Sequence, residues 1–490
     1  MLPDLLRSEL PFLKDQLELR VANSNRGKRI SLDATATTPP TIEALKAFVQ
    51  ASTYYAPFER GGSESGIRTS LATLAIYNLL ANLIGAQSWK EIVLGKNTTE
   101  MLNHVANTFK RGFEGFPRLQ SGQNVVTTYL EHNSNYLPWL ELTNFLREYD
   151  VDVELRLVDV DPKTGKLDVK DLSKKVDRNT RIVSVTGKSN VLATTTSLGE
   201  IGEIAHRQGA LFVVDGAQLV PGHYVDVKDT NVDLLAFSLH KMMAPFGVGV
   251  LYGKSSVLEA MPPFIVGGGT VKDVDKSRVE YYGLPQKFLA WSPDSLGIIA
   301  SGISIQTLLH AALGSLGAGN EQQKAYISMV LNAPSEGWEH RYQVSQQEGA
   351  MIRAEAESIG RTDTLRDPRA RRDYARQLVA TAMGNIAEHE IELTRRALEG
   401  LLEIGGVQVY GSLPAEERYG LVSFNLHGRE ARQIGFELNK RGIEIRPDKH
   451  CAHLLHHHIL KVNGTVRASF APYNTTEEVN QLLSAVREVA

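Results

Sequence analysis

The stretch LFVVDGAQLVPGHYVDVKDTNVDLLAFSLHKMMAPFGVGVLY, Leu211 to Tyr252, decides the fold of this chain. It contains three short, mostly apolar runs, at 211–214, 233–237 and 247–252. Short apolar runs without polar interruptions are typical of strands that are buried on both faces, as in a parallel sheet. We therefore predict an α/β fold whose central sheet is mostly parallel and is flanked by helices.

Polar side chains follow the first two runs. Asp215-Gly216-Ala217-Gln218 ends the first, and Ser238-Leu239-His240-Lys241 ends the second. Open α/β sheets bind their ligands at the carboxyl ends of the strands, so these groups are expected to converge on one edge. A lysine for a Schiff base, a carboxylate for a pyridinium nitrogen and donors for a phosphate are what pyridoxal 5'-phosphate (PLP) needs. A lone lysine at a strand end is usually solvated, so the prediction of a PLP site rests on the whole set.

The same block resembles the cofactor site of the class V aminotransferase superfamily. It is most similar to the Suf-type (group II) cysteine desulfurases and selenocysteine lyases, and the resemblance extends from about Ile30 to the C-terminus. It implies the type I fold of PLP-dependent transferases. Such a fold has a large domain with a mostly parallel seven-stranded sheet flanked by helices, and a smaller C-terminal α/β domain.

The resemblance also implies the domain boundaries. Residues 1–29 would be an N-terminal segment packing with the small domain, 30–313 the large PLP-binding domain, and 380–490 the small domain. Residues 314–379 have no counterpart in the family's core pattern. Because this segment is rich in Gln, Glu and Arg, we expect a mostly helical insertion with a solvated face, outside the PLP site.

The resemblance assigns roles in cofactor binding to individual residues. Lys241 would carry PLP, Asp215 would keep its pyridine nitrogen protonated, and His132 would stack on the ring. The remaining assignments, to the phosphate, the phenolic oxygen and the rest of the cofactor, fall on Thr98, Thr99, Asn190, Gln218, Ser238, His240 and Thr270. Thr270 would reach the phosphate of a neighbouring subunit and so implies a homodimer. From the residues alone, threonines at a helix start are mostly N-caps, a lone histidine is mostly structural, and Asn190 suits a turn.

The only cysteine, Cys451, lies in Pro447-Asp448-Lys449-His450-Cys451-Ala452-His453. It stands where Suf-type desulfurases carry the thiol that becomes a persulfide, and Lys449 and His450 would favour its thiolate form. The alternative is a small residue buried in the core. Arg467 matches the family's arginine that binds the substrate α-carboxylate with both arms of its guanidinium, and Arg446 would assist.

The histidines around Cys451 and at 456–458 raise the alternative of a metal site. Their spacing matches no standard zinc pattern, so we expect no metal.

Composition limits the class of protein. The chain has 490 residues, 42% of them hydrophobic, and a formal net charge of −3, which favours neither nucleic acid nor an anionic membrane as partner. A single cysteine excludes an intramolecular disulfide framework. No apolar stretch is expected to reach the length of a membrane span, and the N-terminus resembles neither a secretory signal nor a transit peptide. We therefore expect a cytoplasmic protein.

These features together predict a PLP-dependent cysteine desulfurase. It would convert L-cysteine to L-alanine, keep the sulfur as a persulfide on Cys451, and pass it to a sulfur-acceptor protein. The alternatives are a C–S or C–Se lyase that works without Cys451, a class V aminotransferase, or a non-catalytic scaffold that keeps the fold.

Overall fold

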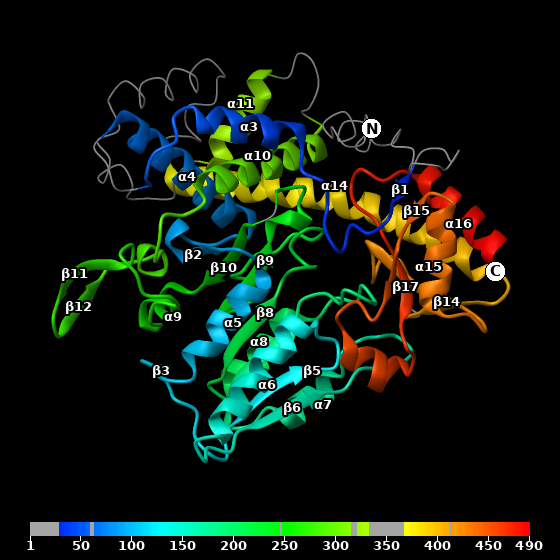
Figure 1. Cartoon of the computed structure of the whole chain (residues 1–490), viewed down its shortest axis with the longest axis horizontal. Coiled ribbons are helices and arrows are strands. Elements are labelled where there is room, and N and C mark those ends of the chain that lie inside the picture. The colour runs from blue at the N-terminus through cyan, green and yellow to red at the C-terminus, as the bar shows by residue number, and fades with distance from the viewer. Residues whose placement is uncertain (1–28, 59–62, 246, 315–320, 333–366, 412–413) are drawn as a thin grey trace.

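The computed structural model describes residues 29–58, 63–245, 247–314, 321–332, 367–411 and 414–490. A large domain and a smaller one lie along the long axis of the molecule, and the helix α14 (Pro368–Leu402) runs from one to the other (Figure 1). The expected N-terminal segment up to residue 28 and most of the expected insertion, 333–366, lie outside the described residues.

A seven-stranded sheet forms the middle of the large domain. In spatial order its strands are β2 (Ile92–Gly95), β10 (Gly249–Gly253), β9 (Leu234–Ser238), β8 (Leu211–Asp215), β7 (Thr180–Thr186), β5 (Asn124–Thr128) and β6 (Glu154–Val158). The pairs from β9 to β6 are parallel, whereas β10 is antiparallel to both of its neighbours. The predicted mostly parallel seven-stranded sheet is confirmed, with the third run of the opening stretch as its antiparallel member.

Strand β8 shows why these runs form a buried sheet. Successive side chains of a strand point to opposite faces. Phe212 and Val214 belong to the hydrophobic cluster on one face, and Leu211 and Val213 to the cluster on the other. All four are buried. Because burying one such side chain stabilises the fold by about 1.5–3 kcal/mol, a strand covered on both faces needs an apolar residue at every position.

Helices supply the other half of each cluster. The first cluster takes residues from α4 (Glu64–Leu83), α7 (Val169–Lys175), α8 (Leu198–Arg207), α10 (Ser295–Ala312), α11 (Glu321–Asn332) and α14. The second takes residues from α5 (Thr98–Thr108), α6 (Asn133–Arg147) and α9 (Ser255–Ala260). Within the segment 314–379, the described residues form two helical parts, which are α11 and the start of α14.

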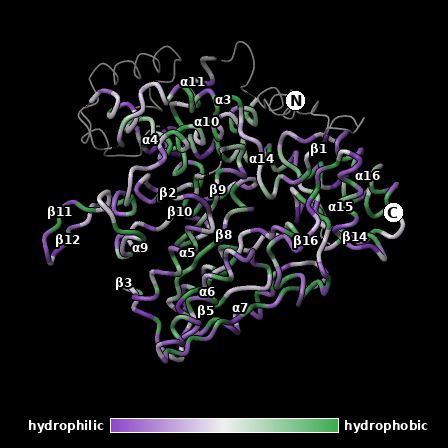
Figure 2. The backbone as a smooth tube through the Cα atoms, in the orientation of Figure 1, coloured by the Kyte–Doolittle hydropathy of each residue, from purple (hydrophilic) through white to green (hydrophobic). Residues whose placement is uncertain are grey.

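Helix α10 is rich in hydrophobic residues (Figure 2) and buried along nearly its whole length, and α3 (Ile42–Ser52), α4 and α14 pack against it. Among the described residues, α10 is the one helix that is long and apolar enough to cross a membrane, and 89% of Ser295–Ala312 is buried inside the protein. The expectation that no apolar stretch reaches this length is therefore wrong. Helices that are hydrophobic all round occur in the cores of large proteins as well as in membranes, and burial accounts for the composition of α10.

The small domain contains a four-stranded antiparallel sheet. Its strands are, in order, β13 (Val407–Tyr410), β14 (Leu421–Leu426), β17 (Thr465–Ser469) and β16 (Arg446–Asp448), with α15 (Ala431–Lys440) and α16 (Thr476–Val489) beside them. Strand β1 (Ile30–Ser31) pairs with β15 (Ile443–Glu444), and Ile30 and Leu32 lie in this domain's core. Residues 30–32 thus pack with the small domain, although they precede the large one in the chain.

Two short hairpins lie apart from these sheets. One consists of β3 (Gly112–Phe113) and β4 (Phe116–Pro117). The other, β11 (Val271–Asp275) with β12 (Arg278–Tyr281), projects from the body of the large domain (Figure 1).

Strand β10 passes very close to the loop that leads into α5. A Cβ atom on Gly249 would lie 2.4 Å from the backbone nitrogen of Asn97. We expect Gly249→Ala to lower the melting temperature, since inserting a methyl group into packed backbone costs about 1–3 kcal/mol. Gly384→Ala is the matched control, because open space surrounds Gly384 in α14. There, alanine should raise helix stability by about 0.5–1 kcal/mol. Thermal unfolding of both variants checks this, and equal melting temperatures would contradict it.

Candidate active site

A cavity of about 260 Å³ lies at the carboxyl ends of β8 and β9, where residues of the small domain face the large one. The predicted site residues that line it are Thr98, Thr99, His132, Asn190, Asp215, Gln218, Ser238, His240, Lys241, Arg446 and Arg467. Cys451 and Thr270 do not line it. The edge of the sheet thus brings together nearly all of the predicted cofactor and substrate residues.

Lys241 and Asp215 form the charged centre of the cavity. Lys241 ends a short 3-10 turn, Leu239–Lys241, directly after β9, and burial lowers the pKa of its amine to about 8 while Asp215 opposes the shift. Asp215 ends β8 and accepts a hydrogen bond of 2.9 Å from the Ala217 N–H. Burial raises the pKa of this carboxyl, and the Ala217 bond and Lys241 oppose it. Two adjacent strands therefore deliver a reactive amine and a carboxylate to one buried space.

Hydroxyl groups gather at the N-terminus of α5. The Ser238 Oγ accepts a hydrogen bond of 2.7 Å from the Thr98 N–H and lies 2.6 Å from the Thr98 Oγ1. The N-cap of α5 is Asn97, whose Oδ1 accepts from the Glu100 N–H at 2.9 Å, so the N-cap alternative for the threonines is wrong. Helix N-termini attract anions through their free N–H groups and dipole. Thr98, Thr99 and Ser238 thus form a cradle suited to a phosphate.

Both predicted histidines of the site are neutral. His132 is the N-cap of α6, and its Nδ1 accepts a hydrogen bond of 3.1 Å from the Ser134 N–H. Burial, and after it the charge of Lys241, lowers the pKa of His132 to about 4. Burial also lowers the pKa of His240 to about 4, and its Nδ1 lies 3.1 Å from the Thr37 Oγ1. His132 therefore combines the structural role with a flat, uncharged ring suited to stacking.

Arg467 occupies the other end of the cavity and is 1% exposed. Its Nη2 donates to the Asp33 Oδ1 at 2.6 Å and its Nη1 to the Asn190 carbonyl at 3.0 Å. The Nε of Arg467 and the Oδ1 of Asn190 are buried without a hydrogen-bond partner among the described residues. Buried polar atoms are almost always paired, so these two atoms indicate a polar ligand in this part of the cavity.

The cysteine loop lies beside the cavity. Cys451 is partly exposed, which excludes the alternative of a residue buried in the core. Arg446, which lines the cavity, has its Nη2 3.7 Å from the Cys451 Sγ. The Cys451 carbonyl accepts a hydrogen bond of 2.6 Å from the Asn133 N–H, which fixes the loop to the start of α6. His450 and Cys451 both have left-handed backbone conformations, with φ of 52° and 54°. Such a conformation is costly for residues other than glycine.

The expectation that His450 supplies positive charge to the thiol is wrong. His450 is buried, and its Nε2 lies 2.9 Å from the Thr465 Oγ1. Burial, and after it the charge of Arg467, holds the pKa of His450 well below its usual value, so the ring is neutral. The cation beside the thiol is Arg446.

The sequence also raised the alternative of a metal site. No group of three or more His, Cys, Asp or Glu side chains converges among the described residues.

Several lining residues were not singled out from the sequence. They are Thr35, Ala36, Asn97, Ser134, Thr186, Lys188 and Ala217. Asn97 and Ala217 adjoin predicted residues, so for these two proximity in the chain was the available signal. Lys188 is different, because it adds a buried cation to the loop after β7 that sequence patterns did not explain.

The residues present fit PLP. Lys241 can hold the cofactor covalently, Asp215 can pair with a pyridinium nitrogen, and the hydroxyls at α5 can bind its phosphate. The unpaired Oδ1 of Asn190 and the neutral ring of His132 are available for the rest of the cofactor.

The lowered pKa of Lys241 gives a direct test of this electrostatic environment. Only the neutral amine reacts with acetic anhydride, so acetylation of Lys241 in the cofactor-free protein should increase about tenfold per pH unit and level off above about pH 8. Exposed Lys272 is the control, because its hydrogen bond to Glu280 raises its pKa and its reaction should keep accelerating beyond that pH. Peptide mass spectrometry resolves the two sites. Parallel profiles for the two lysines would show that burial does not act on Lys241.

Comparisons with known proteins agree with this geometry. The family model described as aminotransferase class-V matches residues 30–364 and 372–482. Its gap is narrower than the expected insertion at 314–379. A cysteine desulfurase of Pectobacterium atrosepticum is 31% identical over 89% of this chain and 86% of its own length. One of Haloferax volcanii is 29% identical over 99% of this chain and 96% of its own.

A solved structure gives the same result. The apo structure of a cysteine desulfurase from Thermococcus onnurineus NA1 superposes with a TM-score of 0.76 at 28% identity, and covers 99% of this chain and 98% of its own. The resemblance inferred from the sequence is confirmed at the level of the family: the chain belongs to the aminotransferase class-V family and is a PLP-dependent enzyme.

Proposed function

We propose that this enzyme is a cysteine desulfurase that converts L-cysteine to L-alanine and takes the sulfur onto Cys451 as a persulfide. The observation that carries the proposal is the place of Cys451, whose thiol is partly exposed and 3.7 Å from the Nη2 of a cavity-lining arginine, Arg446. The names of the similar proteins support the same activity.

Substrate binding falls to the small-domain arginines. The guanidinium of Arg467 has an unpaired Nε, and Arg446 adds a second positive charge at the same end of the cavity. Together they suit the α-carboxylate of an amino acid, because a planar guanidinium can bind both carboxylate oxygens. The Asp33 carboxylate holds the Nη2 arm of Arg467 in place.

Proton transfer falls to Lys241. An amine with a pKa of about 8 is present in both forms near neutral pH, so it can accept a proton from the substrate Cα and return one to carbon. When bound, PLP supplies the electron sink that makes this proton acidic. Asp215 would pair with the cofactor's ring nitrogen, and His132 offers a neutral ring that would stack on it.

Sulfur transfer falls to Cys451. Its thiolate attacks the substrate sulfur, so that an S–S bond forms as the C–S bond breaks. The electron pair of the C–S bond stays on carbon, which takes a proton from Lys241 to give alanine. The persulfide then needs a thiol acceptor, and a sulfur-acceptor protein is the partner that this requires. The positive charge of Arg446 stabilises negative charge on the cysteine sulfur.

A homodimer and a cytoplasmic location complete the proposal. Thr270 is buried at the base of the projecting β11–β12 hairpin, and its Oγ1 donates to the Gly267 carbonyl at 2.9 Å. Its absence from the lining of its own cavity is what a role in a neighbouring subunit requires. A single cysteine and a net charge of −3 are consistent with a reducing compartment and with no binding to nucleic acid or membrane.

The first test separates a desulfurase from a lyase. We expect Cys451→Ala to keep bound PLP and its absorbance, yet to form alanine from L-cysteine at least about 100-fold more slowly, because the attacking nucleophile is gone. Selenocysteine turnover should fall much less, since selenium leaves without thiolate attack. Alanine formation from both substrates is the assay, and Lys241→Ala, inactive on both, is the control.

Two outcomes of this test would contradict the proposal. Undiminished cysteine turnover by Cys451→Ala would make the enzyme a lyase. Equal loss on both substrates would make the role of Cys451 structural.

The second test concerns the homodimer. Mixed dimers of a Lys241→Ala subunit and a Thr270→Val subunit should contain one fully intact site, if Thr270 acts in the neighbouring subunit. We expect such dimers to recover about half of the wild-type activity, since one of two equivalent sites is complete. Each variant alone should stay impaired, and a mixture no more active than its components would place Thr270 outside the neighbour's site.

A further inference from the structure

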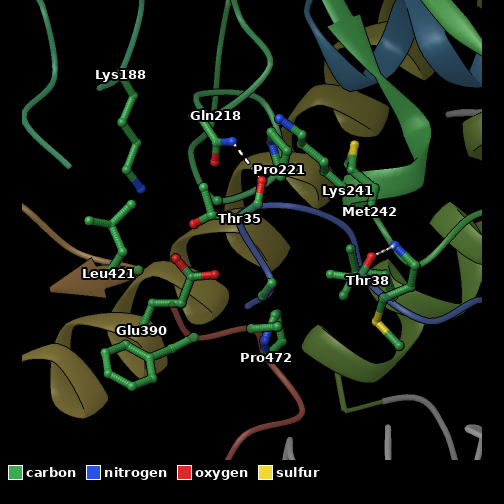
Figure 3. Close-up of a pocket in the computed structure, with 17 residues that line it drawn as sticks. Thr35, Thr38, Lys188, Gln218, Pro221, Lys241, Met242, Glu390, Leu421 and Pro472 are labelled. Atoms are coloured by element: carbon green, nitrogen blue, oxygen red, sulfur yellow. Dashed lines mark hydrogen bonds between the residues drawn. The ribbon is translucent and has the colours of Figure 1, made fainter. Parts of the chain in front are cut away.

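A second, smaller chamber of about 40 Å³ lies next to the active-site cavity, and Lys241 is one of its lining residues (Figure 3). Lys241, Thr35, Gln218 and Lys188 line both the chamber and the active-site cavity. Glu390 of α14 lines the chamber but not the active-site cavity. Lys241 therefore shares the chamber with charged groups that the proposed sulfur chemistry does not use.

Lys188 and Glu390 are both almost fully buried, at 4% and 6% exposure. The Lys188 Nζ lies 4.7 Å from the centre of the Tyr419 ring. Within the described part of the chain, neither head group makes a hydrogen bond to another protein group, and no direct ion pair joins the two. A buried ammonium and a buried carboxylate without hydrogen bonds are costly, so their presence requires compensation by something in the chamber.

The two head groups face each other across Gly420. A Cβ atom on Gly420 would lie 2.8 Å from the Glu390 Oε2 and 3.2 Å from the Lys188 Nζ, and one on Gly222 would lie 2.9 Å from the same oxygen. Figure 3 shows the side chains of Lys188 and Glu390 pointing toward each other. Thr35, Gln218 and Lys241 line the same chamber. The two glycines thus leave open the space between the charges.

The size and polarity of the chamber suit water. One water needs roughly 10–15 Å³ of such volume and two to four polar partners. The chamber offers about 40 Å³, the two charged groups and the side-chain amide of Gln218. Burial raises the pKa of Glu390 and lowers that of Lys188, while their mutual attraction opposes both shifts. A proton that passes from one of the two groups to the other leaves the net charge of the pair unchanged.

We propose that this chamber holds ordered water that carries protons between Lys241 and the Lys188–Glu390 pair. Lys241 first accepts a proton from the substrate Cα and becomes an ammonium. One N–H bond of this ammonium then breaks, and the released proton passes through water to the pair. A proton from the pair or its water then restores the ammonium. No bond order or oxidation state changes, because the step only exchanges one proton for another.

The proposal predicts where the hydrogen returned to carbon comes from. With an exchange route, a deuteron taken from Cα is largely lost to water before Lys241 protonates the product. Without it, the same deuteron is returned to carbon. The readout is the fraction of label kept in the product alanine, which is independent of how fast alanine forms.

The experiment uses the PLP-loaded enzyme with L-cysteine deuterated at Cα, in ordinary water, with mass spectrometry of the alanine. Wild type should keep little label. General acid–base groups accelerate proton transfer by about 100-fold or more, so in Glu390→Gln the retained fraction should increase by about fivefold or more, while turnover falls by less than about threefold. Lys188→Met should act in the same direction.

Two further variants make the test specific. The double variant Lys188→Met/Glu390→Leu replaces the pair with apolar groups, which buried pairs often tolerate, and should show the same increase if a single variant folds poorly. Asp233→Asn removes a buried carboxylate remote from the chamber, bonded to His206 and Lys254, and should leave the retained fraction unchanged. A retained fraction equal to wild type in every chamber variant would overturn the proposal, as would high retention by wild type itself.

Discussion

The parallel pairing of β8 and β9 is the constraint on which the rest of the site depends. Asp215 stands opposite Ala236 in that pairing, so the end of β8 and the turn after β9 meet at one edge of the sheet. The sheet is buried on both faces, which keeps water away from both groups. An amine and a carboxylate are thereby held together in a space where neither is fully solvated. Burial shifts both pKa values toward neutrality, and this makes Lys241 usable as a base.

The site is also a product of the interface between the domains. Arg467 of the small domain bonds to Asp33 and to the Asn190 carbonyl, and the Asn190 amide donates to the His450 carbonyl at 2.7 Å. The Asn133 N–H holds the Cys451 carbonyl. The bonds of Asn190 and Asn133 join the small-domain side of the cavity to the large domain. Movement of one domain against the other would therefore displace the arginines and the thiol together. Lys188 and Glu390 meet at the same interface, where α14 crosses between the domains.

The sequence predicted the fold and most of the candidate site for a local reason. The runs at 211–214 and 233–237 are apolar at nearly every position because β8 and β9 are covered on both sides, and the residues that follow a strand must lie at its end. Thr98 and Thr99 line the cavity for the same reason, since they open the helix after β2. Asp215, Ser238 and Lys241 reach one cavity because they end two strands that are paired in parallel.

Other features depended on partners that are distant in the chain. Strand β1 joins the small domain because its hydrogen-bonding partner, β15, lies far away in sequence. The sequence predicted a positively charged His450. In the structure its ring is neutral, because packing against Thr465 removes it from water. Glu390 faces Lys188 only because α14 brings them together. The sequence by itself determined which groups stand at the ends of strands. Only the tertiary structure decided their protonation and their partners, because burial and long-range contacts set both.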